Sequence, residues 1–214
     1  MTEALRERFI KYRKTLVNTC SYGLMNLKIL VSLLKYFKDN PNDYTRLSTI
    51  FFRTTEDALY ENFLSYLFRI FDRHRNALSI YKFLNFIEAN LIKLFPNDRN
   101  AVTIRIKQDK DSLDTEKDLL DKLRIIRDKA HFHQDIKHAG NYIQLYRQSQ
   151  IPIEKLEKIV NLVLEIVDFY SNLFDGRRVK FELEKHIKND INDLFMFINR
   201  GKKEFEDNAK DKKE

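Results

Sequence analysis

The sequence has few of the residues that interrupt helices. Its 214 residues include only four glycines and three prolines. A multi-stranded β fold needs a turn about every 8–12 residues, and turns draw heavily on these two residue types. Their scarcity argues against a β-rich fold and predicts an all-α protein. The 17 phenylalanines and 10 tyrosines are enough for an aromatic-rich core.

Cysteine is almost absent as well. Cys20 is the only one, which excludes an intrachain disulfide and a cysteine-based zinc cluster. Its position in an amphipathic segment favours a buried structural thiol over a nucleophile.

Long apolar runs are also missing. The longest apolar stretches, such as residues 27–37, contain lysines and are shorter than the ~20 residues of a membrane helix. The charged residues 1–14 lack the apolar centre of a signal peptide. We therefore expect a soluble cytoplasmic protein without a membrane partner.

The motifs of several common enzyme classes do not occur. The sequence contains no GxxxxGKS/T or GxGxxG phosphate-binding loop, no HExxH zinc motif and no GxSxG nucleophile elbow. These gaps argue against P-loop NTPases, dinucleotide-binding enzymes, HExxH zinc proteases and serine hydrolases. We expect no cofactor.

Apolar residues recur with helical spacing along most of the chain. Ser79 is a predicted helix N-cap, and Pro152 suits a first helical position. Gly23 is a place where the first helix could bend or divide. Residues 101–107 alternate weakly, which leaves a short strand or an irregular segment open. The predicted helices cover residues 3–37, 44–72, 80–95, 112–130, 153–174 and 180–199.

The length of the chain fits one domain. We predict a single helical domain over residues 1–200. The segment 201–214 is highly charged and low in apolar residues, a composition that predicts a disordered tail.

Basic residues outnumber acidic ones, and the formal net charge is +7. Much of the excess lies in residues 1–38, where eight lysines and arginines accompany two glutamates. Such a segment either attracts phosphate backbones without sequence specificity or forms a solvated helix face. The sequence leaves both interpretations open.

The stretch RDKAHFHQD (127–135) gathers the residue types that carry chemistry. His131 and His133 are two residues apart, so on a helix they point about 200° away from each other. They could share a metal, with Asp135 as a further ligand, only if the backbone is extended there. We favour a site without a metal.

An arginine and a histidine at one helix end suit RNA cleavage. The 2′-hydroxyl attacks the adjacent phosphate while one group removes its proton and another protonates the leaving 5′-oxygen. Imidazole suits both transfers because its pKa lies near neutral pH. The guanidinium fork matches the oxygens of the charged phosphorane.

This stretch also resembles a known family. Arg127 and His133 have five residues between them, within the R-x(4–6)-H pattern of HEPN domains. The string LRIIRDKAHFHQD (123–135) is similar to the LRxxRDKxxAHxD signature of the AbiU-type abortive-infection branch. LFRIFDRHRNALSIYKFLN (67–85) resembles that branch's helix–turn–helix with its DR-x(5)-S-hydrophobic-Y core. The resemblance covers roughly residues 45–175, and it implies a HEPN-like helical bundle with additional N- and C-terminal helices.

For function, the resemblance implies a metal-independent endoribonuclease that acts as a toxin or phage-defence effector. Its site would be composite across a homodimer, with Arg127 binding the scissile phosphate and His133 as general acid or base. Asp128 and Asp135 would support them. The expected partners are RNA, with tRNA as one candidate, and a second copy of the chain. The resemblance also allows a cognate antitoxin.

Two alternatives remain beside this hypothesis. Arg124 and His131 have six residues between them and lie on one helical face, so they form a second register of the same pattern. We favour Arg127 and His133 because that register aligns the whole string. In addition, many HEPN-like domains are noncatalytic modules that bind a nucleotide, a nucleic acid or a partner protein.

Overall fold

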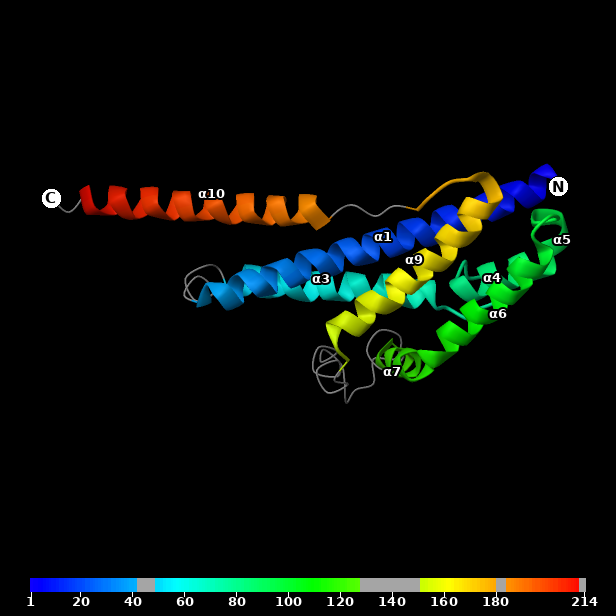
Figure 1. Ribbon diagram of the computed structural model, residues 1–214. Helices are drawn as coiled ribbons and strands as arrows, with labels where there is room; N and C mark the ends of the chain where they lie inside the picture. Colours follow the sequence, from blue (N-terminus) through cyan, green and yellow to red (C-terminus); the bar gives the residue numbers. More distant parts are fainter. Residues whose placement is uncertain (42–48, 128–150, 180–183, 212–214) are drawn as a thin grey trace. The chain divides into compact units, whose positions relative to one another are not determined.

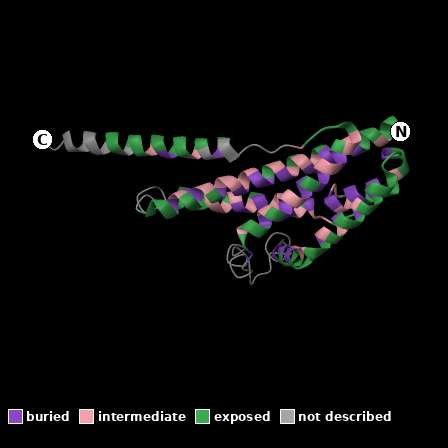
Figure 2. Ribbon diagram, viewed as in Figure 1, coloured by how far each residue is buried: buried purple, intermediate pink, exposed green. Residues whose placement is uncertain are grey.

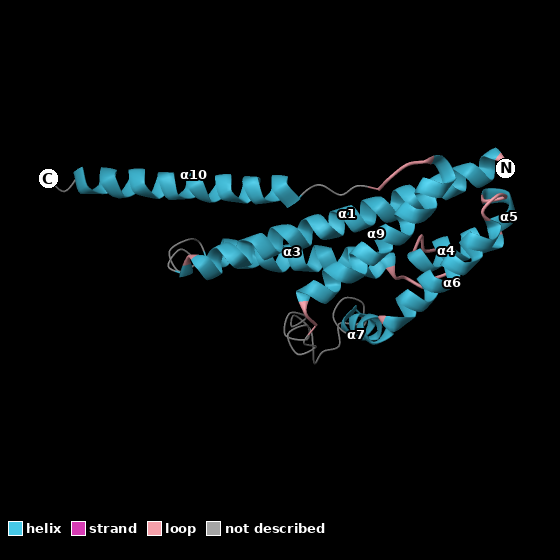
Figure 3. Ribbon diagram, in the orientation of Figure 1, coloured by secondary structure: helices cyan, strands magenta, loops and turns pink. Residues whose placement is uncertain are grey.

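A computed structural model describes residues 1–41, 49–127, 151–179 and 184–211 of the protein (Figure 1). Within these ranges the chain forms helices and loops and no strands (Figure 3), which confirms the all-α prediction. No described helix combines the length and apolar character needed to cross a membrane. The helices are α1 (Glu3–Asp39), α3 (Thr49–Ile70), α4 (Ile80–Ala89), α5 (Leu91–Leu94), α6 (Arg99–Thr115), α7 (Lys117–Arg127), α9 (Ile153–Asp175) and α10 (Glu184–Asp211).

The backbone groups into two compact units. Unit 1 contains Met1–Leu24 and Glu61–Lys180, and unit 2 contains Met25–Tyr60 and Phe181–Glu214. Helices α1 and α3 contribute to both units. The single domain expected over residues 1–200 stays a prediction.

Aromatic packing holds unit 1 together. Phe9 of α1 stacks on Phe174 of α9 with ring centroids 4.1 Å apart, and it lies 5.5 Å from Phe83 of α4. Phe83 in turn meets Tyr170 of α9 edge-on at 5.9 Å. Such pairs contribute about 0.5–1.5 kcal/mol beyond the area they bury. Figure 2 shows buried residues along one face of these helices and exposed residues on the other.

A buried carboxylate joins α6 to α9. Asp109 is 3% exposed, and its two oxygens accept hydrogen bonds from Arg105 Nε and the Tyr170 hydroxyl, each at 2.8 Å. Burial raises the pKa of Asp109, and the bonds from Tyr170 and Arg105 oppose that rise. The Arg105 guanidinium also lies 4.8 Å from the centre of the Phe169 ring on α9.

A second ion pair joins α1 to the end of α9. Arg13 is buried, and its Nη1 donates to Asp175 Oδ1 at 2.7 Å. The helix ends one residue later at Gly176, which has φ 72° and donates its N–H to the carbonyl of Asn172. Glycine tolerates this left-handed conformation without a Cβ clash.

Unit 2 has its own aromatic core. Phe195 of α10 stacks on Tyr36 of α1 with a 5° interplanar angle, and Phe37 and Phe52 pack edge-on to each other beside it. Helix α10 continues to Asp211. The segment 201–211, which composition predicted to be disordered, is therefore helical.

Most predicted helices are confirmed, but three expectations about the middle of the chain are wrong. The expected helix 80–95 is divided at Asn90, which has φ −120° and ψ 17° and separates α4 from α5. Residues 101–107 form part of α6, neither a strand nor an irregular segment. Val102, Ile106 and Leu113 are buried on one helical face, whereas Ile104 is 60% exposed. The expected helix 112–130 is divided at Glu116, which has φ −94° and ψ 12°. The Thr115 hydroxyl donates to the carbonyl of Ser112 and competes with the helical pattern there.

Two helix starts differ in detail from the predictions. Ser79 occupies the N-cap of α4 as expected, but its side chain makes no capping hydrogen bond. Pro152 is the N-cap of α9, with φ −65° and ψ 138°, one position before the predicted first turn. Gly23 does not divide α1, which is one helix from Glu3 to Asp39. A Cβ there would lie 3.3 Å from Cβ of Tyr66, so glycine permits the close approach of α1 and α3 in unit 1.

Removing the buried carboxylate should destabilise unit 1. We expect Asp109→Ala to lower the free energy of unfolding by about 2–4 kcal/mol, because Arg105 and the Tyr170 hydroxyl lose their common acceptor. The matched control is Asp111→Ala on the exposed side of the same helix, where the change should stay within about 0.5 kcal/mol. Urea unfolding followed by circular dichroism measures both, and equal effects would show that the network contributes nothing specific.

The Arg13–Asp175 pair should make stability depend on pH. Partial burial by itself raises the pKa of Asp175, but the hydrogen bond and charge of Arg13, with Arg177, bring it below the ordinary value of 3.8. A carboxylate whose pKa is lower in the folded state than in the unfolded state stabilises the protein at any pH above its unfolded-state pKa. This contribution to stability is lost as the pH falls through the folded-state pKa. Asp175→Asn should therefore cost about 1 kcal/mol at neutral pH, with the difference from wild type shrinking below pH 3.8.

The test is a series of urea titrations between neutral and acidic pH. In an Arg13→Met background the same Asp175→Asn change should show a much weaker pH dependence, since the main partner is gone. An unchanged pH dependence in that background would assign the effect to another group.

Candidate functional site

Helix α7 carries the described part of the predicted Arg/His site. Arg127 is its last residue, and Arg124 lies one turn earlier with an exposed side chain. Asp128, His131, His133 and Asp135 lie outside the described residues. The structure therefore places the two arginines of the competing registers on one helix and leaves both histidines untested.

The helix is positioned by a strongly apolar inner face. Leu119, Leu123 and Ile126 are 2–7% exposed, and their spacing of four and three residues puts them on one side of α7. Arg124 and Ile125 face solvent. Positions 124 and 127 are three residues apart, so they fall on the same side of the helix.

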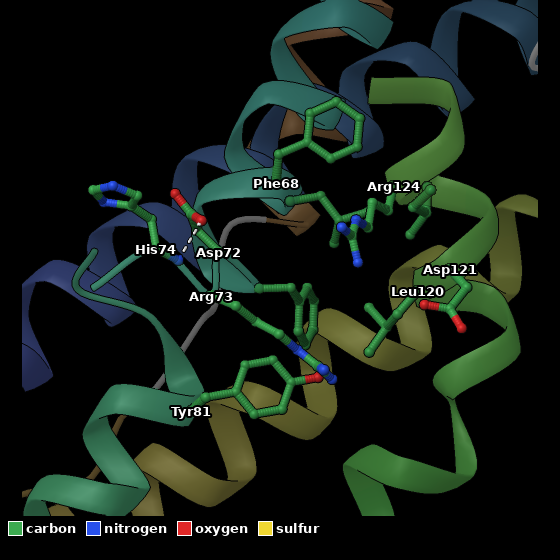
Figure 4. Close-up of a pocket in the computed structure, with 11 residues that line it drawn as sticks. Phe68, Asp72, Arg73, His74, Tyr81, Leu120, Asp121 and Arg124 are labelled. Atoms are coloured by element: carbon green, nitrogen blue, oxygen red, sulfur yellow. Dashed lines mark hydrogen bonds between the residues drawn. The ribbon is translucent and has the colours of Figure 1, made fainter. Parts of the chain in front are cut away.

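A pocket of about 500 Å³ lies between α7, the end of α3 and the start of α4 (Figure 4). Its apolar lining comes from α3 and α7, and its polar lining comes from the turn after α3, Tyr81 of α4 and α7. The lining residues are Leu67, Phe68, Phe71, Asp72, Arg73, His74, Tyr81, Leu120, Asp121, Leu123 and Arg124.

Arg73 and Tyr81 form the polar corner of this pocket. The guanidinium carbon lies 4.8 Å from the centre of the Tyr81 ring, within cation–π range. A hydrogen bond with the Tyr81 side chain raises the pKa of Arg73, and the carboxylates of Asp114 and Asp121 add to the rise. Arg73 is therefore a cation that lies against Tyr81 at the edge of the pocket (Figure 4).

Asp72 and His74 shape the turn between α3 and α4. Asp72 Oδ1 accepts the backbone N–H of His74 at 2.9 Å, and His74 Nδ1 accepts the N–H of Asn76 at 3.4 Å. These bonds give the carboxylate and the imidazole structural partners within the turn. In the view of Figure 4 the His74 ring lies beyond Asp72, on the side away from Arg124.

The stretch 67–85 carries a family resemblance in the sequence, and the structure shows that it also contributes to a pocket. In the structure, Asp72, Arg73 and Tyr81 line the same pocket as Leu123 and Arg124, which open the string LRIIRDKAHFHQD. Two separate motifs of the sequence thus meet in space. The signal in the sequence was the Asp72-Arg73 pair followed by Tyr81 at the start of the next helix, but its meaning depended on where α7 packs.

Cys20 can be set aside as a nucleophile. It is fully buried in α1, and burial raises the pKa of its thiol far above the ordinary value. A buried neutral thiol neither attacks a substrate nor binds a metal readily. This agrees with the structural role predicted from the sequence.

Comparison with known protein families decides the assignment. The family model for AbiU2, a HEPN family, matches residues 7–197. The chain belongs to the AbiU2 family of HEPN domains. The match extends well beyond the 45–175 expected from the two strings, and it includes all of α7, the pocket and part of α10. Searches of curated proteins and of solved structures gave no match for this AbiU2-family chain.

Proposed function

We propose that this AbiU2-family protein is a metal-independent endoribonuclease that acts as a toxin or phage-defence effector. One observation supports the proposal most directly: α7 bears Arg124 and Arg127 one turn apart, and Arg124 lines a pocket together with a third arginine, Arg73. Arginine positions gathered on one helix and beside one pocket suit a phosphodiester substrate, because a guanidinium matches phosphate oxygens. The family membership supports the same class of activity.

The proposed reaction is transesterification of RNA. The 2′-oxygen attacks the adjacent phosphorus and gives up its proton to one imidazole, while the bond to the 5′-oxygen breaks and a second imidazole protonates that oxygen. The products are a 2′,3′-cyclic phosphate and a 5′-hydroxyl. Arg127 holds the phosphate oxygens, where negative charge builds up in the transition state. His133 supplies the proton transfers.

A homodimer provides the second histidine in this proposal. One His133 from each protomer would act as base and acid, respectively, at a site composite across the two chains. Asp128 orients the neighbouring Arg127, and Asp135 holds the tautomer of His133. RNA is the substrate class, with tRNA as one candidate, and a cognate antitoxin would restrain the activity in the host.

Induced expression in a bacterial host tests the proposal. Wild-type protein should stop growth and fragment total RNA, whereas Arg127→Ala and His133→Ala should do neither, because each loses at least about 100-fold in cleavage rate. Growth curves and RNA electrophoresis are the measurements, with immunoblots to show equal protein levels. Equal harmlessness of all three, with intact RNA, would favour a noncatalytic binding module.

Two controls sharpen this experiment. His131→Ala tests the register and should behave like wild type; if it is inactive while His133→Ala is active, Arg124 and His131 form the site. Purified wild-type protein should keep cleaving in EDTA. Loss of cleavage there, restored by a divalent metal, would replace this mechanism with a metal-dependent one.

A further inference from the structure

The pocket beside α7 has one wall suited to a flat apolar group. Phe68 and Phe71 are half-buried at its edge, and Leu67 and Leu123 are almost fully buried beneath. Leu120 of α7 completes this wall. Proteins bind unpaired strands largely through such contacts, because the flat face of any nucleobase can pack against an aromatic or aliphatic surface. At about 500 Å³, the pocket falls in the usual range for small organic ligands.

The polar lining includes two arginines on different elements, together with Asp72, His74, Tyr81 and Asp121. Arg73 lies in the turn after α3 and is held against Tyr81, and Arg124 projects from α7 (Figure 4). A guanidinium that already has a fixed position loses little conformational entropy when it binds a phosphate. The pocket therefore combines an apolar wall with cations for an anionic group.

Asp121 makes a simple anion an unsuitable ligand. Its carboxylate lies in the same lining as the two arginines, so it would repel free phosphate or sulfate at close range. A nucleobase, in contrast, carries N–H donors that a carboxylate accepts. A ligand with both an anionic phosphate and an N–H-bearing flat ring fits all three kinds of lining group, and a nucleotide is such a ligand.

The pocket also has a defined place relative to the proposed cleavage site. Arg124 lies three residues before Arg127 on α7, a rise of about 4.5 Å along the helix. We infer that the pocket binds one unpaired nucleotide of the RNA, its base against Phe68 and Leu120 and its phosphate at Arg124, next to the phosphate that is cut. The inference rests on the proposed function, which identifies the strand as RNA. It makes Arg124 a substrate-positioning residue. It also requires the RNA to be single-stranded at this position.

A binding experiment with an uncleavable strand tests this inference. The probe is a fluorescent 2′-O-methyl RNA hexamer of mixed sequence, which lacks the attacking hydroxyl, and the comparison is a hexamer of abasic units with the same phosphates. Fluorescence anisotropy with the wild-type full chain should show about tenfold tighter binding of the base-containing strand. Equal affinity for the two strands would overturn the inference.

Two variants locate the binding in the pocket. Arg124→Ala should weaken hexamer binding about tenfold, and Leu120→Trp should do the same by filling the space. The matched control is Arg99→Ala, which removes another exposed arginine at the far end of α6 from α7 and should change affinity less than about twofold. Circular dichroism checks folding, and if Leu120→Trp does not fold, Arg124→Ala against Arg99→Ala decides. Equal effects of those two arginine variants would show general charge attraction only.

The outcomes separate this inference from the proposed function. Wild-type protein that is harmless and leaves RNA intact, yet prefers the base-containing hexamer through Arg124, would keep the nucleotide pocket and remove the nuclease. Cleavage that depends on Arg127 and His133, without any preference for bases, would keep the nuclease and remove the pocket.

Discussion

The packing of Tyr170 is the interaction on which unit 1 depends. Its ring is fully buried on α9 and meets Phe83 of α4, while its hydroxyl donates to Asp109 of α6. One side chain thus fixes three helices by apolar contact and by a hydrogen bond to a buried carboxylate. Because Asp109 also accepts a hydrogen bond from Arg105, each oxygen of the buried carboxylate has a donor, which offsets part of the cost of burying its charge.

This junction positions the pocket from two sides. Phe83 belongs to α4, whose first turn carries Tyr81 and whose approach from α3 contains Asp72 and Arg73. Asp109 belongs to α6, which is followed directly by α7 after the turn at Glu116. The two halves of the pocket are therefore extensions of helices that meet at Tyr170. In the function that we propose, this scaffold would position guanidinium groups before the RNA arrives, as electrostatic stabilisation of a phosphodiester requires.

The basic N-terminal helix shows how charge in a sequence divides between structure and solvent. Arg13 is buried and bound to Asp175, and the Arg8 guanidinium lies 5.1 Å from the centre of the Phe86 ring. These two cations support the packing of α1 on α9 and α4. They illustrate why a count of charges alone overstates the surface available to a nucleic acid: long basic side chains also cover apolar residues and close ion pairs.

The sequence by itself determined the helical class, most helix positions and the family, because apolar spacing and local motifs are properties of neighbouring residues. It placed Ser79 at a helix start, and it singled out both 67–85 and 123–135. It did not show that residues 101–107 continue a helix, because weak alternation suits either structure until Val102 and Ile106 find a core to face. Nor could it show that Arg73, Tyr81 and Arg124 line one pocket. Arg73 and Arg124 are 51 positions apart in the sequence. Only the packing of α7 beside the α3–α4 turn brings these residues together, since tertiary contact depends on the burial of whole helix faces and not on local spacing.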